Sequence, residues 1–194
     1  GEPRREARFT GGKLIVATPR RIELVQRASQ WLQYRPGTET ALIAGLLSTI
    51  LEEGLTAQEF VAASTSGLEA LQASLQGWTP ARAAEATGVA EAEIRAAARA
   101  FAGSPAAAII YDTHLIEFSA DSSAVSGLIN LTLATGQIGK AGTGIHVLRA
   151  DGNSQGLSDL GLRPGATPTV LEPLSAGQTK AVFIAGANPV AEDR

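Results

Sequence analysis

Short apolar runs alternate with helical patterns along most of the chain. Three runs, Lys13–Ala17, Ala106–Tyr111 and Ala181–Ala185, are uninterrupted and bounded by turn residues, which is typical of strands buried in a parallel sheet. Trp31–Tyr34 alternates apolar and polar side chains and indicates a further short strand. The alternation of strands with helices predicts an α/β fold with a mostly parallel sheet.

Start and stop signals mark the expected helices. Thr38 is predicted to cap a helix over Thr40–Glu53, and Gly54 provides the glycine that commonly follows a helix. Thr79 and Pro80 combine an N-cap with proline at the first helical position. Further helices are expected over Ile22–Ala28, Thr56–Ala63, Ser66–Leu75, Ala81–Ala86, Glu91–Ala102 and Ser119–Ala134.

The stretch Thr135–Gly161 is rich in glycine and has no hydrophobic period. Loops longer than about 12–15 residues are uncommon in compact domains and are usually functional or disordered. Regularly spaced leucine, isoleucine and valine residues in and around this stretch argue against disorder. We therefore predict a shaped loop that lines a binding site, where glycine permits close approach of the backbone.

Three segments are expected along the chain. Residues 1–164 form part of one α/β domain, residues 165–180 form an irregular linker rich in proline, threonine and serine, and residues 181–194 hold the first strand and turn of a following α/β unit. The sequence contains no methionine. We expect a piece of a longer protein, and a complete processed chain is the alternative.

Composition excludes several kinds of site. The net charge of −3 and the scattered lysine and arginine residues give no reason to expect nucleic acid as a partner. The absence of cysteine excludes disulfides and thiolate metal ligands within these residues. His114 and His146 are too isolated to form a zinc site. No apolar run reaches the roughly 20 residues of a membrane helix, so direct membrane insertion is not expected.

Polar turns follow the three apolar strands, at Thr18–Arg21, Asp112–His114 and Gly186–Asn188. The carboxyl ends of parallel strands meet at one edge of a sheet, where open α/β sheets bind ligands. A shared crevice is one interpretation. The other is that every α/β domain has polar turns at these positions.

Five basic residues are candidates for phosphate contacts, assisted by backbone N–H groups of the loop glycines. A solvated surface is the alternative for them. Neither a Walker loop nor the Rossmann glycine fingerprint is present, because the glycines of the loop follow a helix rather than a strand. The five residues are Arg20, Arg21, Arg35, Lys140 and Arg149.

Acidic and histidine residues give no catalytic constellation. His114 stands two residues after Asp112, an offset that seldom aligns two side chains in a turn. Asp151 and Asp159 suit turn and cap positions better than a carboxylate pair. We predict no catalytic residue and no metal ligand in this segment.

Several compound motifs carry a family resemblance. Val16–Glu23 reads VATPRRIE, Arg35–Leu42 reads RPGTETAL, and Thr135–Gly144 reads TGQIGKAGTG, followed by Leu148-Arg149 and Asn153–Gly156. From about Lys13 to Pro189, the chain resembles the molybdopterin oxidoreductase superfamily, which includes formate dehydrogenases and periplasmic nitrate reductases. It also resembles the related domain in the large iron–sulfur subunit of NADH–quinone oxidoreductase.

The resemblance implies a fragment of a formate dehydrogenase/DMSO reductase-like domain, with a mostly parallel Rossmann-like sheet and helices on both faces. Such a domain is built around molybdopterin guanine dinucleotide, and the glycine-rich loop would line the cofactor cleft. The metal-ligand residue of catalytic members would lie upstream. The cofactor-binding positions implied are Thr18, Arg20, Gly37, Thr38, Glu39, Gly136, Gly139, Lys140, Gly142, Arg149 and Asn153.

The chain departs from the family pattern at four places. Glu39 stands at the second acidic position and is one methylene longer than the family residue. Thr18 replaces the first acidic residue, and a hydroxyl cannot make the bidentate acceptor contact of a carboxylate. Asp112–His114 replaces a glycine-rich turn, and Asp151 adds a further carboxylate after Arg149. Added negative charge and lost contacts would both weaken binding of a polyanionic cofactor.

These departures favour a scaffold as the first hypothesis. The chain would be a segment of the large iron–sulfur subunit of respiratory complex I, without a cofactor of its own and without catalysis. Iron–sulfur clusters would lie elsewhere in the full chain, and electrons would pass from NADH to quinone. The partners would be other subunits of a respiratory complex, peripheral on the cytoplasmic side of the membrane.

Two alternatives remain open. The first is the cofactor-binding domain of a molybdenum or tungsten oxidoreductase of formate dehydrogenase or nitrate reductase type, which would bind molybdopterin guanine dinucleotide. The second is a stand-alone nucleotide-binding or scaffold module without a redox partner.

Overall fold

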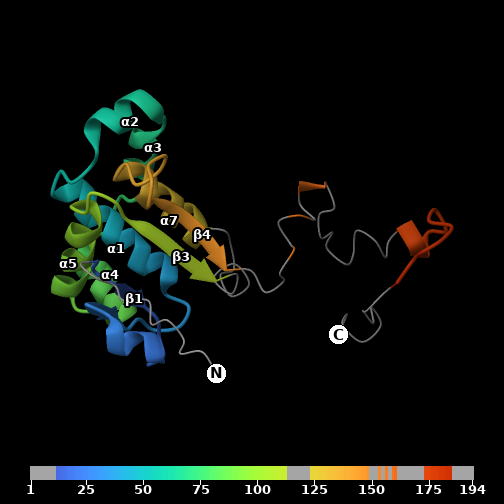
Figure 1. The fold of residues 1–194 in the computed structure, drawn as a ribbon, viewed down its shortest axis with the longest axis horizontal. Coiled ribbons are helices and arrows are strands. Elements are labelled where there is room, and N and C mark those ends of the chain that lie inside the picture. The colour runs from blue at the N-terminus through green and yellow to red at the C-terminus, as the bar shows by residue number, and fades with distance from the viewer. Residues whose placement is uncertain are drawn as a thin grey trace, which may run out of the picture. The chain divides into compact units, whose positions relative to one another are not determined.

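The computed structural model describes residues 12–112, 123–148, 153, 156, 159–160 and 173–184. The chain divides into two units, Gly1–Leu148 and Arg149–Arg194. Figure 1 shows the first unit as helices around short strands. Its strands are β1 (Ile15–Ala17), β2 (Gln30–Leu32), β3 (Ala108–Asp112) and β4 (Gly144–Leu148). Its helices are the 3-10 helix η1 (Glu23–Arg27), α1 (Glu39–Glu52), α2 (Gln58–Ser64), α3 (Leu68–Ser74), α4 (Pro80–Thr87), α5 (Glu91–Ala102) and α7 (Ser123–Ala134).

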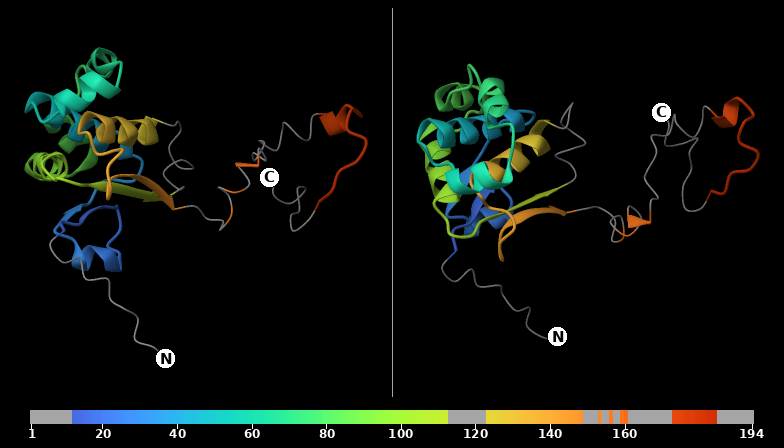
Figure 2. Two further views of the ribbon diagram at one scale, coloured as in Figure 1. Left: turned by 45° about the horizontal axis from the view of Figure 1, so that its top comes forward. Right: turned by 90° about the horizontal axis from the view of Figure 1, so that it is seen from above.

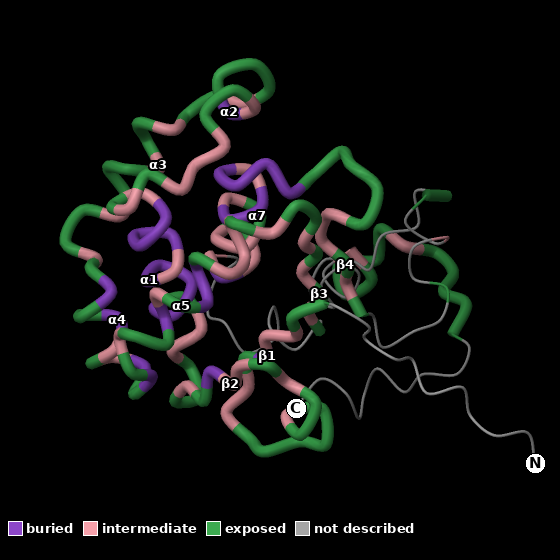
Figure 3. Tube along the Cα trace, turned by 60° about the vertical axis from the view of Figure 1, so that its left-hand side comes forward, coloured by how far each residue is buried: buried purple, intermediate pink, exposed green. Residues whose placement is uncertain are grey.

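The strands form two parallel pairs. β1 pairs with β2 in a register that sets Ile15 opposite Gln30, and β3 pairs with β4 in a register that sets Ala108 opposite Gly144. The parallel direction confirms the prediction from sequence. The described strands do not join into one sheet, and Figure 3 shows them following one another in the order β2, β1, β3, β4.

Helix α1 is the centre of the first unit. Its residues 41–45 and 47–50 are buried, and Figure 3 shows the buried positions concentrated in α1 and its neighbours. Leu46 packs against both hydrophobic clusters of the unit. The first cluster is Leu32, Leu42, Ala83, Val89, Ile94 and Ala97, and the second is Ile43, Leu47, Ile50, Ala98, Ala124 and Leu131. One helix therefore supports both strand pairs.

Helices α1 and α7 start on the same side of the unit. In the first turns of the two helices, the hydroxyls of Thr40 and Ser123 lie 3.1 Å apart. At the other end, the N–H of Ala57, which follows α1, donates to the carbonyl of Ala134, the last residue of α7, over 2.9 Å. α1 begins shortly after the end of β2, and α7 ends shortly before β4 begins. The carboxyl ends of both strand pairs therefore lie on one side of the unit, which we call the carboxyl edge.

Ion pairs join the end of α1 to α5. Arg99 Nε lies 2.6 Å from Glu53 Oε2, and Arg95 Nη1 lies 3.1 Å from Glu53 Oε1. The hydrogen bond from Arg99 holds the pKa of the Glu53 carboxyl below its usual range. A carboxylate at the last turn of a helix opposes the helix dipole, so the two guanidinium groups offset an unfavourable position.

The structure confirms one of the predicted helix starts in full and corrects two others. Arg82 N donates to Thr79 Oγ1 over 3.1 Å, so Thr79 caps α4 and Pro80 is its first residue as expected. Thr38 occupies the N-cap of α1, but its hydroxyl donates to Arg35 O over 2.6 Å and caps no helical N–H. Helix α2 begins at Gln58 after its N-cap Ala57, two residues later than the predicted start at Thr56.

The predicted strands also need corrections. β3 was expected to be buried, yet its burial alternates, and Ile110 is 65% exposed. Figure 2 shows α7, in yellow, over one face of β3 and β4. Ile109 packs on that side, and the strand alternation turns Ile110 to the other face. Residues 181–184, predicted as part of a strand, form no strand, and Phe183 is 93% exposed.

Candidate functional site

The turn after β1 lies on the carboxyl edge and is fastened to β2. Thr18 N donates to Leu32 O over 3.2 Å, and the indole N–H of Trp31 donates to Thr18 O over 3.0 Å. The Thr18 hydroxyl stays within its own turn, where it accepts from Arg20 N at 3.4 Å and donates to Arg20 O at 3.3 Å. The side chains of Arg20 and Arg21 are exposed. This turn thus offers two cations from a fixed backbone.

The segment Gly37–Glu39 meets the same edge at the start of α1. Gly37 has a φ of +80°, and a Cβ placed on it would meet nothing within 4 Å. Its N–H donates to Glu39 Oε1 over 3.2 Å, which holds the carboxylate beside an open stretch of backbone. Burial, followed by the negative charge of Glu39, raises the pKa of Tyr34 to about 12. Glu39 is thus a positioned hydrogen-bond acceptor on the carboxyl edge.

Asp112 ends β3 and is exposed on the carboxyl edge. The turn predicted to follow it cannot be placed, because Thr113 and His114 lie outside the described residues. The strand ends after β1 and β3 therefore lie on one side of the unit, as expected for a parallel sheet. The third predicted turn, Gly186–Asn188, also lies outside the described residues.

The glycine-rich loop begins at the opposite side of the unit. Gln137 Oε1 accepts from Ala107 N over 2.9 Å at the start of β3, and Gln137 Nε2 donates to Ser104 O over 2.7 Å. Lys140 O accepts from Thr143 N at 3.2 Å just before β4. Gly136, Gly139, Lys140 and Gly142 therefore lie toward the amino ends of β3 and β4. The structure does not bring them together with Thr18 and Glu39.

Two features of this loop were missed from the sequence. Residues 144–148 form strand β4 within the stretch expected to be irregular. Gln137 is 2% exposed and is an internal clamp rather than a loop side chain. A glutamine between Gly136 and the exposed Ile138 gives little sign of this, because its two partners lie about thirty residues earlier in the chain.

The side chain of Arg35 binds backbone carbonyl groups at the end of α4. Its Nη1 donates to Glu85 O over 2.8 Å and to Ala86 O over 3.2 Å, and its guanidinium lies 3.4 Å from the position of a Cβ on Gly88. These bonds satisfy carbonyl groups at the end of α4. The structure therefore favours a role for Arg35 in capping the carboxyl end of α4 over a role as a phosphate ligand.

The remaining predicted positions belong to the second unit. Arg149 and Asp151 lie outside the described residues. Asn153 is exposed in a turn, and a Cβ on Gly156 would collide with its side chain. Asp159 is exposed.

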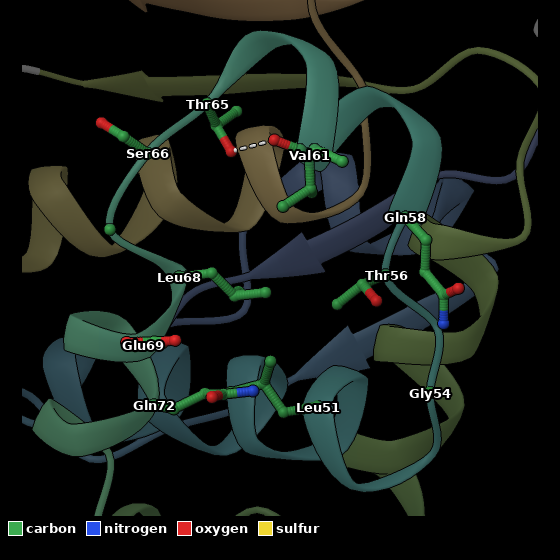
Figure 4. A pocket seen from close by; sticks show the side chains of 12 residues that line it. Leu51, Gly54, Thr56, Gln58, Val61, Thr65, Ser66, Leu68, Glu69 and Gln72 are labelled. Atoms are coloured by element: carbon green, nitrogen blue, oxygen red, sulfur yellow. Dashed lines mark hydrogen bonds between the residues drawn. The ribbon is translucent and has the colours of Figure 1, made fainter.

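A cavity of about 650 Å³ lies at the other end of α1, between α2 and α3. Figure 4 shows its lining, which includes Leu51, Val61, Thr65 and Gln72, with Thr65 Oγ1 donating to Val61 O over 2.8 Å.

Within the described ranges, no three histidine, aspartate or glutamate side chains gather as a metal site. Nor does any helix described there have the length and apolar character to cross a membrane. The carboxyl edge thus remains the candidate site.

Residues 3–194 match the family described as molybdopterin oxidoreductase. The chain belongs to this family. The α subunit of an NADPH-Fe(3+) oxidoreductase from Geobacter sulfurreducens is 36% identical over 205 residues, covering 92% of this chain and 24% of that subunit. Formate dehydrogenase H from Escherichia coli is 35% identical over 162 residues, covering 84% of this chain and 23% of the enzyme.

A third relative, the catalytic subunit of the assimilatory nitrate reductase of Bacillus subtilis, is 32% identical over 164 residues, or 84% of this chain and 23% of that subunit. The solved structure of acetylene hydratase from Pelobacter acetylenicus superposes with a TM-score of 0.60 and 32% identity, over 69% of this chain and 18% of that chain. The α/β fold expected of a molybdopterin oxidoreductase domain is thereby confirmed. The chain spans about a quarter of the length of the curated relatives it matches.

Proposed function

We propose that this molybdopterin oxidoreductase domain binds the nucleotide part of molybdopterin guanine dinucleotide in a molybdenum or tungsten oxidoreductase of the formate dehydrogenase or nitrate reductase type. The observation that carries the proposal is the positioned Glu39 carboxylate on the carboxyl edge, where the side chain of Arg20 is also exposed. The relatives named above include formate dehydrogenase H and the catalytic subunit of a nitrate reductase, and they favour this function over the complex I scaffold.

Glu39 fits a purine base that presents adjacent N–H donors. A carboxylate offers two acceptor oxygens in one plane, and guanine carries two neighbouring donors on its Watson–Crick edge. The N–H of Gly37 fixes one oxygen, so the carboxylate is oriented before a ligand arrives. The Thr18 hydroxyl donates one hydrogen bond and accepts another within its own turn. It is therefore a weaker contact for a base than the carboxylate that it replaces in the family pattern.

Arg20 and Arg21 fit the diphosphate of the same ligand. Both are exposed on a turn that β2 holds in place, and guanidinium groups bind phosphate oxygens with short, charge-assisted hydrogen bonds. The open space at Gly37 leaves room for approach to the backbone. The residues on this edge therefore fit a guanine dinucleotide, and the carboxylate of Asp112 is the feature that opposes its negative charge.

When bound, molybdopterin would supply the metal and its redox chemistry. The residues of this domain would bind and orient the nucleotide end, and the substrate-binding and metal-ligating residues would come from other parts of the full protein. We further propose that the full protein works with other subunits, because the relative from Geobacter sulfurreducens is named as an α subunit. A position on the cytoplasmic side of a membrane stays a prediction.

The test compares the full-length protein with its Glu39→Gln variant, purified from cells supplied with molybdate and tungstate. Molybdenum or tungsten and released guanine nucleotide are measured per protein molecule. Wild type should contain both in near-stoichiometric amounts, and the variant about tenfold less, since a hydrogen bond to a charged group contributes about 1.5–3 kcal/mol. Glu59→Gln, an exposed carboxylate on α2, is the matched control and should retain the wild-type content.

Two results would contradict the proposal. Full-length wild type that is folded yet contains neither metal nor guanine nucleotide would restore the scaffold hypothesis. An unchanged cofactor content in Glu39→Gln would place the base elsewhere than on the carboxyl edge.

A further inference from the structure

Tyr34 and Glu39 stand at the two ends of one turn on the carboxyl edge. Arg35 N donates to Thr87 O over 2.9 Å, which fixes the chain just after Tyr34 to the end of α4. Thr38 N and Thr38 Oγ1 both donate to Arg35 O, over 3.1 and 2.6 Å, and close the turn. Glu39 is then the first residue of α1. Bonds that involve neither side chain therefore set the backbone from which Tyr34 and Glu39 meet.

The phenol of Tyr34 is half-buried, and its hydroxyl has the carboxylate of Glu39 as partner. The ring packs against the first hydrophobic cluster. Burial first, then the charge of Glu39 and a hydrogen bond that the hydroxyl donates to its carboxylate, raise the pKa of Tyr34 to about 12. Burying a hydroxyl is costly unless it is hydrogen-bonded, and phenylalanine would fill the same space without that cost. The hydroxyl therefore serves Glu39 rather than the packing of the ring.

Glu39 accepts hydrogen bonds from neutral donors. Gly37 N donates to its Oε1 over 3.2 Å, and the hydroxyl of Tyr34 is the second donor. Among the residues that the structure describes, the ion pairs lie at the end of α1 and on α5, and none includes Glu39. A carboxylate has about four acceptor sites. Two uncharged donors therefore leave its charge and part of its accepting capacity for a ligand.

The length of the Glu39 side chain makes the second donor useful. A glutamate has one more rotatable bond than an aspartate, so its backbone restrains the carboxylate less. The bond from Gly37 holds one oxygen only. A second bond from the phenol restrains the plane of the two oxygens. The orientation of that plane decides whether both oxygens can reach adjacent N–H groups of a base.

We propose that Tyr34 is a positioning residue for guanine, whose hydroxyl orients the Glu39 carboxylate so that both of its oxygens accept from the base. This inference rests on the proposed function, in which Glu39 contacts the guanine. Tyr34 touches the carboxylate and acts on the nucleotide only through it. Loss of the hydroxyl should weaken retention of the nucleotide without disturbing the fold, because a phenylalanine ring still packs on the first cluster.

The test is a double-mutant cycle in the full-length protein, purified from cells supplied with molybdate and tungstate. Guanine nucleotide retained after extended dialysis is quantified per protein molecule by mass spectrometry in wild type, Tyr34→Phe, Glu39→Ala and the double variant. Tyr34→Phe should retain about threefold to fivefold less than wild type, the effect expected of one hydrogen bond. In the Glu39→Ala background the same substitution should change the content by less than about twofold, because its effect depends on that carboxylate.

The control variant is Tyr111→Phe. Tyr111 is the other tyrosine of these residues and is likewise half-buried, on β3, so this variant should retain the wild-type content. A second measurement needs no cofactor. The absorbance of tyrosinate in Glu39→Ala should show Tyr34 titrating at a lower pH than in wild type, because two of the causes of its raised pKa are removed.

The outcomes separate this inference from the proposed function. Wild-type content in Tyr34→Phe, or an equal loss with and without the Glu39 side chain, would overturn the role of Tyr34 and leave the proposed function intact. Unchanged titration of Tyr34 in Glu39→Ala would overturn the contact between the two side chains. Folded wild-type protein without guanine nucleotide would contradict the proposed function, and this inference with it.

Discussion

The side-chain amide of Gln137 donates a hydrogen bond of 2.7 Å to the backbone carbonyl of Ser104, at the turn between α5 and β3. Its oxygen accepts from Ala107 N, and the residue is 2% exposed. Replacement by leucine would leave the part-buried N–H of Ala107 and the part-buried carbonyl of Ser104 without this partner. We expect Gln137→Leu to lower the free energy of unfolding by about 2–4 kcal/mol, measured by chemical denaturation of the full-length protein.

The control is Gln76→Leu, at an exposed position after α3, which should change stability by less than about 0.5 kcal/mol. A Gln137→Leu variant as stable as the control would show that water or another group replaces the clamp.

Helices α1 and α4 pack so closely at Gly45 that adding a single methyl group there should lower the stability of the protein. A Cβ on Gly45 would lie 2.5 Å from the Cβ of Ala83 and 3.3 Å from Ile94 Cγ2. Alanine favours helix over glycine by about 1 kcal/mol, yet overpacking a core costs about 1–3 kcal/mol. We expect Gly45→Ala to destabilise the protein and lower its melting temperature. Gly12→Ala, where a Cβ meets nothing within 4 Å, is the control, and a stabilised Gly45→Ala would contradict the packing.

The raised pKa of Tyr34 predicts that the protein loses stability at alkaline pH. Burial first, and then the charge of Glu39, raise its pKa from 10.0 to about 12. The folded state therefore favours the neutral phenol, so its contribution to stability is complete below pH 10 and lost as the pH rises to about 12. Tyr34→Phe should weaken this pH dependence of the melting temperature, and tyrosinate absorbance should lose its latest-titrating component.

Glu39→Gln provides the second half of this experiment. Because burial is the larger cause, the pKa of Tyr34 in that variant should fall only part of the way toward 10.0. Complete titration of Tyr34 near its ordinary pKa in the wild-type protein would contradict the burial that the structure gives it.

Local sequence signals were sufficient for most helices. Thr79 and Pro80 fixed the start of α4 because a cap and a proline act within one turn of chain. The apolar face of α1 was visible as a period, and Gly54 marked its end. The motif Arg35–Leu42 also led to the family and to Glu39 on the carboxyl edge. These features depend on neighbours a few residues apart.

Features that depend on distant neighbours were missed or misassigned. Strand β4 begins at a glycine and contains His146, and only its pairing with β3 makes it a strand. Arg35 was a candidate for phosphate contact or for a solvated surface, because its partners at the end of α4 lie fifty residues along the chain. The glycines of the loop were placed with the strand ends, although Gln137 holds them at the other side of the unit.

The sequence by itself determined the family, the order of most helices, and the types of side chain available to contact a nucleotide. The tertiary structure decided which of these residues share an edge. The reason is that helix periods and caps are set by bonds within one turn, whereas strand pairing and burial depend on which segments meet in space. Glu39 and Thr18 lie on the same edge because β1 and β2 pair in parallel, and no local pattern encodes that pairing.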